Sequence, residues 1–163
     1  MKAPFERIVS RHGATVLRVC TFVLGRVDAE DAWSETFLAA LRAYPELSDD
    51  ANVEAWLVTI AHRKSVDIIR RRQRDAIAVS ELPDRPSPIG VPGEADDELT
   101  EAVKTLPPKQ RQAVAYHYLV GLPYAEIAEI LGGSAAAARK AASDGIATLR
   151  TKYPDALTKG EHR

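Results

Sequence analysis

The strongest constraint on the fold is a segment near the middle of the chain that is unsuited to regular structure. Four prolines and two glycines stand between residues 83 and 93, and proline lacks a backbone donor and fixes φ. The surrounding residues 75–98 carry seven acidic side chains and one basic side chain. We interpret this stretch as an extended, flexible linker between two domains, the alternative being a surface loop within one domain.

The 163 residues of the chain leave room for a small domain on each side of this linker. Apolar residues on both sides recur at intervals of three and four, which is typical of amphipathic helices. No stretch alternates with a period of two for long enough to form a strand, so the predicted class is all-α. The first domain is expected over residues 1–74, the second over 99–153 and a tail over 154–163. The expected helices span residues 5–24, 28–44, 53–74, 99–106, 108–120, 123–131 and 134–152.

In the second of these helices, residues 28–44, the expected buried face is formed by Trp33, Phe37, Leu38 and Leu41.

Composition excludes several classes of function. The single cysteine, Cys20, cannot form an internal disulfide, and the four histidines show no metal-ligand spacing. The chain has neither a glycine-rich phosphate loop nor a nucleophile motif. Its longest apolar stretch, residues 14–24, is interrupted by Arg18 and is too short to span a bilayer. We therefore expect a cytoplasmic protein without catalytic activity, cofactor, metal site or membrane insertion.

The end of the third expected helix is strongly basic. Six of the twelve residues from Arg63 to Arg74 are lysine or arginine. Arg63, Arg70 and Arg74 are seven and four residues apart, so they share one face of a helix. Such a row can neutralise phosphates and release their counterions. We therefore predict a contact with nucleic acid, the alternative being a solvated helix end that balances its own dipole.

The second domain contains the spacing of a helix-turn-helix. Ala128 is small where two helices would cross, Gly132 allows a positive φ in the turn, and Ser134 can cap the next helix. That next helix would enter the major groove of DNA. A helical hairpin without a role in DNA binding is the alternative for this pattern taken alone.

In their order along the chain, these motifs resemble the extracytoplasmic-function (ECF) group of bacterial RNA polymerase sigma factors. Residues 28–37 resemble the helix by which that family binds core polymerase, and residues 55–71 resemble its promoter-melting helix. Residues 106–111 and 121–132 resemble the domain that reads the −35 element. The resemblance covers residues 5–150. It implies two helical domains, sigma region 2 and sigma region 4, that bind core RNA polymerase and promoter DNA, with an anti-sigma factor as a further partner.

The resemblance also assigns roles to individual residues. Those expected to contact core polymerase are Asp28, Asp31, Glu35, Thr36 and Phe37. Those expected at the −10 element and in promoter melting are Asn52, Trp56, Arg63, Lys64, Arg70 and Arg71. Those expected at the −35 element are Ser134, Arg139, Lys140 and Ser143. Trp56 also fits burial on the apolar face of its helix, and burial would prevent it from stacking on a base.

Two departures from the family's pattern bear on promoter reading. His62-Arg63 stands where relatives commonly have Arg-Asn, and four alanines, residues 135–138, fill positions that normally carry polar readers and a bulky core residue. Alanine can touch a thymine methyl but cannot read a hydrogen-bonding edge, so we expect little base reading at the −35 element. Two other interpretations remain: a sigma-like regulatory or interaction protein with weakened promoter reading, and a stand-alone helix-turn-helix regulator of transcription.

Overall fold

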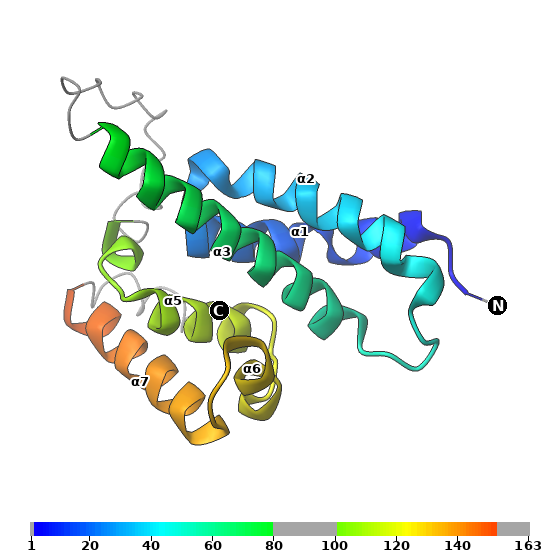
Figure 1. Ribbon diagram of the computed structural model, residues 1–163. Coiled ribbons are helices and arrows are strands. Elements are labelled where there is room, and N and C mark those ends of the chain that lie inside the picture. Colours follow the sequence, from blue (N-terminus) through cyan, green and yellow to red (C-terminus); the bar gives the residue numbers. More distant parts are fainter. Residues whose placement is uncertain (1, 80–100, 153–163) are drawn as a thin grey trace.

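The computed structural model describes residues 2–79 and 101–152. Its first part is a bundle of three helices, α1 (Phe5–Leu24), α2 (Arg26–Ala43) and α3 (Val53–Val79), with a short 3-10 turn, η1 (Tyr44–Glu46), after α2. Figure 1 shows this bundle with the helices of the second part packed below it. The predicted all-α class is confirmed, and neither described range contains a strand.

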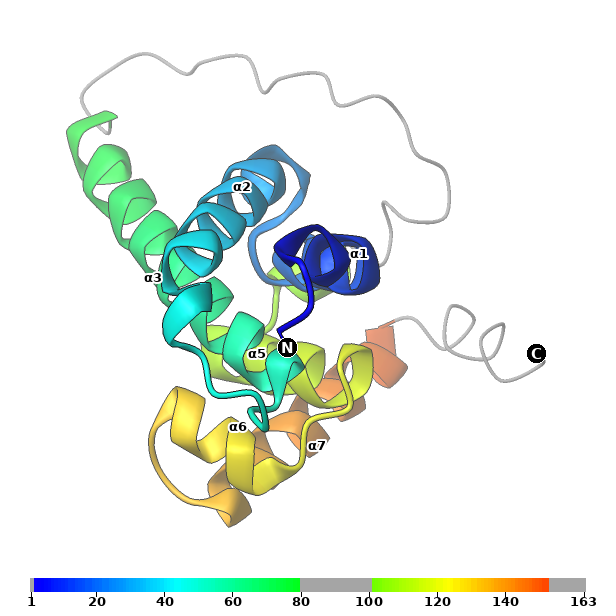
Figure 2. The ribbon, with the colours of Figure 1, turned by 90° about the vertical axis from the view of Figure 1, so that its right-hand side faces the viewer.

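The second part is built around a helix-turn-helix. Residues 101–104 are helical, and α5 (Pro108–Val114) continues into one π-helical segment, η2 (Ala115–Leu119). The pair α6 (Tyr124–Leu131) and α7 (Ala135–Lys152) follows, and α7 packs on both α5 and α6. Figure 2, in which α1 is seen nearly end-on, shows α5 between the first bundle and α7. In the described parts of the chain, no helix has the length and apolar character needed to cross a membrane.

Glycines with positive φ end the helices where the sequence predicts breaks. Gly25 has φ 89° at the end of α1, and Gly132 and Gly133 have φ 84° and 100° in the turn between α6 and α7. Residues with a side chain rarely adopt this conformation. Because the chain turns sharply at Gly25, α2 begins at Arg26, two residues before the expected start at Asp28.

Helix α3 runs five residues past the expected domain boundary at residue 74. Nothing from residue 75 to residue 79 stops a helix, since the first proline of the acidic segment is Pro83. Residues 75–79 are therefore helical. The remainder of the expected linker, residues 80–98, and the tail over residues 154–163 lie outside the described residues.

The core of the first bundle depends on small residues of α2. Ala32 and Ala40 are fully buried and Ala29 nearly so, which allows α2 to approach its neighbours closely. Leu38 and Leu41, in contrast, are 55% and 51% exposed. Their expected place on the buried face is therefore wrong, because the alanines occupy the side of α2 that faces the bundle.

The two domains share one apolar core. Tyr116, Leu122 and Ile127 of the second domain belong to the same buried cluster as Val23 and Leu57 of the first. Helix α1 contacts α5 and η2, and α3 contacts α6. We call this inter-domain surface the seam. The seam also contains polar contacts, one of which places the hydroxyl of the buried Tyr116 2.8 Å from Nδ1 of His62 on α3.

Arg111 fastens the seam at the end of α1. Its Nη1 donates to the carbonyl oxygen of Val23 at 2.8 Å, and its Nε donates to that of Val103 at 3.1 Å. Its Nη2 donates to the carbonyls of Lys104 and Leu106, at 3.1 and 3.0 Å. Burial lowers the pKa of Arg111, but a guanidinium remains charged in proteins. One side chain thus joins α1 to the turn that precedes α5.

Gly145→Ala should destabilise the second domain. A Cβ at residue 145 would lie 2.7 Å from Cγ2 of Val114 and 3.4 Å from the carbonyl oxygen of Gln110. Val114 is buried and β-branched, so it cannot rotate away cheaply. We expect the free energy of unfolding to fall by about 1–3 kcal/mol, measured by urea denaturation, even though alanine is the better helix former.

Gly13→Ala is the matched control, because Gly13 is also a buried glycine within a helix. A Cβ at that position would lie 3.5 Å from Cζ2 of Trp33, which is an ordinary contact. We expect this variant to be as stable as the wild type or more stable by up to about 1 kcal/mol. Equal losses in the two variants would contradict the steric explanation for Gly145.

The seam should weaken in mild acid. Burial, followed by the neighbouring Arg63 charge, lowers the pKa of His62 below its ordinary value. The unfolded chain therefore binds a proton near pH 6.5 more readily than the folded protein does, so stability is lost as the pH falls through that value. We expect a lower melting temperature at about pH 5.5 than at about pH 7.5, with a smaller difference in His62→Gln. His12, whose pKa is lowered chiefly by burial, retains part of the effect. An undiminished pH difference in His62→Gln would refute the assignment to His62.

Candidate nucleic-acid interface

From its middle to its C-terminal part, α3 presents a row of exposed arginines. Arg63, Arg70 and Arg71 are exposed, as predicted for a surface that meets phosphates, and Lys64 is half-buried. Arg71 lies 3.7 Å from a carboxylate oxygen of Glu35, a solvent-exposed pair of the kind that contributes little energy. A shallow hollow on this surface is lined by Asp67, Arg70, Arg71, Gln73, Arg74 and Ile77.

Arg72 has a different task from its neighbours. Its guanidinium donates to the carbonyl oxygen of Leu24 at 3.0 Å and pairs with the carboxylate of Asp28. Successive residues of an α-helix are about 100° apart, so Arg72 lies on nearly the opposite side of α3 from Arg70 and Arg74. All four arginines at residues 70–74 are exposed, but Arg72, at 46%, also ties α3 to the corner between α1 and α2.

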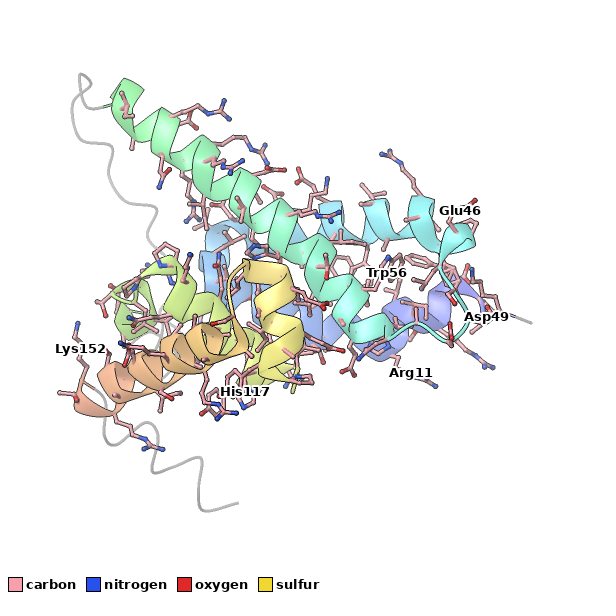
Figure 3. All side chains as sticks on the ribbon, turned by 60° about the horizontal axis from the view of Figure 1, so that its bottom comes forward. Arg11, Glu46, Asp49, Trp56, His117 and Lys152 are labelled. Atoms are coloured by element: carbon pink, nitrogen blue, oxygen red, sulfur yellow. The ribbon has the colours of Figure 1, made fainter. Side chains whose placement is uncertain are left out.

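The loop before α3 places Asn52 and Trp56 at one end of the bundle. Oδ1 of Asn52 accepts the backbone N–H of Ala55 at 3.2 Å, so Asn52 is the N-cap of α3. The Trp56 ring is half-buried and packs edge-on against Tyr44, with 6.5 Å between ring centroids. Figure 3 shows Trp56 at the end of the bundle where this loop, with the labelled Asp49, returns to α3. This packing favours the burial alternative for Trp56.

Two of the five residues expected to contact core polymerase lie inside the bundle. Thr36 is fully buried, and its hydroxyl donates to the carbonyl oxygen of Ala32 at 2.6 Å. Phe37 is 6% exposed and packs against the Trp33 ring. Their side chains do not reach the surface, which corrects the expectation of direct contact. They support α2 from within.

The outward face of α2 carries apolar side chains that spacing alone did not reveal. Asp28 and Glu35 are turned toward arginines of α3, whereas Asp31 is exposed. Three exposed apolar residues share the surface of α2 with Asp31, namely Val27, Leu38 and Leu41. The alanines at positions 29, 32 and 40 could have indicated which face of α2 is buried. When the small residues of a helix face the core, its leucines are left on the outside.

The recognition helix α7 begins with a cap and an alanine surface. The hydroxyl oxygen of Ser134 accepts the N–H of Ala137 at 3.1 Å, as its position in the sequence predicts. The alanines at 135–137 are exposed, while Ala138 is buried. The other three residues expected at the −35 element, Arg139, Lys140 and Ser143, are exposed on α7. The exposed face of α7 therefore carries methyl groups at its centre and polar groups beside them.

The buried titratable groups do not form a reactive site. Burial raises the pKa of the Cys20 thiol to about 12, which keeps it protonated and unreactive. Within residues 2–79 and 101–152, no three His, Cys, Asp or Glu side chains gather closely enough to hold a metal ion.

Comparison with known proteins agrees with this geometry. The model of the Sigma-70 region 2 family matches residues 8–75, and that of the Sigma-70 region 4 family matches residues 96–149. The chain is 31% identical over 160 residues to the ECF RNA polymerase sigma factor BldN of Streptomyces coelicolor, covering 93% of this chain and 61% of that protein. It is 30% identical over 152 residues to the RNA polymerase sigma factor CarQ of Myxococcus xanthus, covering 90% of this chain and 87% of CarQ.

Among solved structures, the sigma factor RpoE of Bartonella quintana, crystallised with the anti-sigma factor NepR, has the same fold. Its TM-score is 0.78 at 18% identity, over 93% of this chain and 97% of RpoE. The chain belongs to the sigma-70 family of RNA polymerase sigma factors, in its ECF group. The family resemblance expected from the motifs is confirmed.

Asn52 should contribute to stability as a helix cap. Asn52→Ala removes the acceptor for the Ala55 N–H, and we expect it to lower the free energy of unfolding by about 1 kcal/mol. Asn52→Asp keeps a capping oxygen and should leave stability close to that of the wild type. Urea denaturation of the two variants checks this, and equal losses would contradict the capping role.

Proposed function

We propose that this protein binds core RNA polymerase and directs transcription initiation at a restricted set of promoters, without catalysis of its own. The observation that carries the proposal is the presence on one chain of a region 2 bundle with an exposed arginine row and a region 4 helix-turn-helix. In this division of labour, α3 and the loop before it meet the −10 element, and α7 meets the −35 element.

The contact with core polymerase falls on the outward face of α2. Large apolar side chains that are exposed close together usually mark an interaction surface. Leu38 and Leu41, three residues apart on α2, satisfy this condition. The exposed Val27 and Asp31 lie on the same face of α2, nearer its N-terminal end. An anti-sigma factor is a further proposed partner, since RpoE was crystallised with one.

Co-purification with core polymerase, followed by run-off transcription from a candidate promoter, tests the proposal. Polymerase binding together with transcripts supports it. Polymerase binding without transcripts favours a sigma-like interaction protein, an outcome for which the exposed alanines of α7 provide a reason. DNA binding without polymerase binding favours a stand-alone regulator.

Arg70→Ala combined with Arg71→Ala should weaken promoter binding by the holoenzyme and reduce its salt dependence. Each lost phosphate contact should lower the slope of log K against log salt by about 0.9 on duplex DNA. The fold should survive, because exposed charges rarely contribute more than about 1 kcal/mol. Arg7→Ala combined with Arg42→Ala removes the same charge from exposed positions on α1 and α2 and serves as the control. Equal slopes for the two double variants would show that α3 does not face DNA.

A further inference from the structure

Region 4 carries a side-chain cluster that the predicted DNA-contact residues do not explain. The ring of His117 stacks on that of Tyr124, with 4.1 Å between centroids and 16° between planes. Tyr118 meets His117 edge-on at 4.9 Å. His117 is held in place by its Nδ1–H, which donates to the carbonyl oxygen of Leu122 at 2.9 Å. Figure 3 shows His117 on the side of region 4 away from the C-terminal end of α3. The cluster is therefore packed: Tyr124 lies against the shared core, and Leu122, which accepts the hydrogen bond from His117, belongs to that core.

Arg139 connects this cluster to the recognition helix. Its guanidinium carbon lies 5.3 Å from the centroid of the Tyr124 ring, a cation–π distance. No carboxylate in the described parts of the chain pairs with it. The guanidinium is thus held over the Tyr124 ring of α6 with its hydrogen-bond donors uncommitted. We call Tyr118, Tyr124 and Arg139 the aromatic–arginine edge.

The two tyrosines add further donors at the same place. Tyr118 is 56% exposed. Burial first, and then the Tyr118 side chain, through its charge and a hydrogen bond, raise the pKa of Tyr124. The hydrogen bond between the two tyrosines uses one phenolic hydrogen and leaves the other free. The guanidinium and this free phenolic hydrogen suit phosphate oxygens, which accept hydrogen bonds from both groups.

The position of the edge in the motif matches this chemistry. In a helix-turn-helix bound to DNA, the first helix crosses the sugar–phosphate backbone while the second lies in the major groove. Tyr124 is the first residue of α6, and Arg139 comes from α7, so the edge lies at the junction of the two helices. The side chains of the exposed alanines at 135–137 are methyl groups and cannot make these hydrogen bonds.

We propose that the aromatic–arginine edge binds phosphates of the DNA backbone beside the −35 element, so that region 4 is anchored there independently of base sequence. This inference rests on the proposed function, because it requires that α7 meets promoter DNA. It adds Tyr118 and Tyr124 to the residues that contact DNA. It also gives Arg139 a phosphate as its target instead of a base.

The test measures binding of the assembled holoenzyme to promoter duplexes with an intact or a scrambled −35 element, over a range of salt concentrations. Arg139→Gln should lower the slope of log K against log salt by about 0.9 on both duplexes. The matched control is Arg150→Gln, because Arg150 is an exposed arginine of the same helix about 16 Å further along its axis. This control should leave the slope unchanged.

The double variant Tyr118→Phe, Tyr124→Phe keeps both rings and removes both hydroxyls. It should weaken binding by about threefold to tenfold on the intact and the scrambled duplex alike. Because no charge is lost, its salt slope should equal that of the wild type. Thermal denaturation of the free variants checks that the fold of region 4 is intact.

Three results would overturn the proposal. One is an effect of Arg139→Gln on the intact element alone, which would make Arg139 a base reader. Another is unchanged binding in both Arg139→Gln and the double tyrosine variant. The third is an equal change of slope in Arg150→Gln, which would indicate a diffuse charge effect. Failure of the wild-type protein to form a holoenzyme would instead refute the proposed function itself, and the edge with it.

Discussion

The carboxyl end of α1 depends on two arginines from elsewhere in the chain. The last carbonyls of an α-helix have no partner within the helix, and that end carries a partial negative charge. Helix α1 has no basic residue in its own last turn. Arg72 from α3 donates to the carbonyl of Leu24, and Arg111 from α5 donates to that of Val23. One helix end therefore fixes the direction of α3 and the placement of region 4 at the same time.

This dependence changes the meaning of the arginine cluster on α3. Charge density alone assigns the whole cluster to nucleic acid, yet Arg72 binds the Leu24 carbonyl and the Asp28 carboxylate within the bundle. Helical geometry separates the two roles, because a residue two positions from Arg70 and Arg74 lies on nearly the opposite side. The arrangement lets one short stretch of sequence both position the helix and present an exposed basic surface.

The features that sequence predicted best are those decided by neighbouring residues. The helix breaks at Gly25 and Gly132 and the cap at Ser134 follow from local backbone chemistry, and the structure agrees. The face of α2 was predicted wrongly, because which side of a helix is buried depends on what packs against it. Leu38 has the larger side chain, but Ala40 fits the closer approach.

The packing role of Gly145 and the contacts of the seam could not be predicted from the sequence for the same reason. In isolation Gly145 looks like a weak point of its helix, and its use becomes clear when Val114 is found against it. The bond between His62 and Tyr116 joins residues 54 positions apart, and no local pattern marks either as a partner of the other. The same limit applied to Thr36 and Phe37, whose place in a motif said nothing about which way they point.

The DNA contacts proposed for Asn52 and Ser134 are limited by the role of each residue as a helix cap. Oδ1 of Asn52 and the hydroxyl oxygen of Ser134 each already accept a backbone N–H. The capping bonds do not use the donor hydrogens of these side chains, which are the two amide hydrogens of Asn52 and the hydroxyl hydrogen of Ser134. Both side chains are thereby biased toward acceptor atoms, such as phosphate oxygens or the N7 and O6 atoms of guanine, and away from the amino groups of adenine and cytosine. Folding of the helix ends thus leaves both side chains mainly as hydrogen-bond donors before DNA is bound.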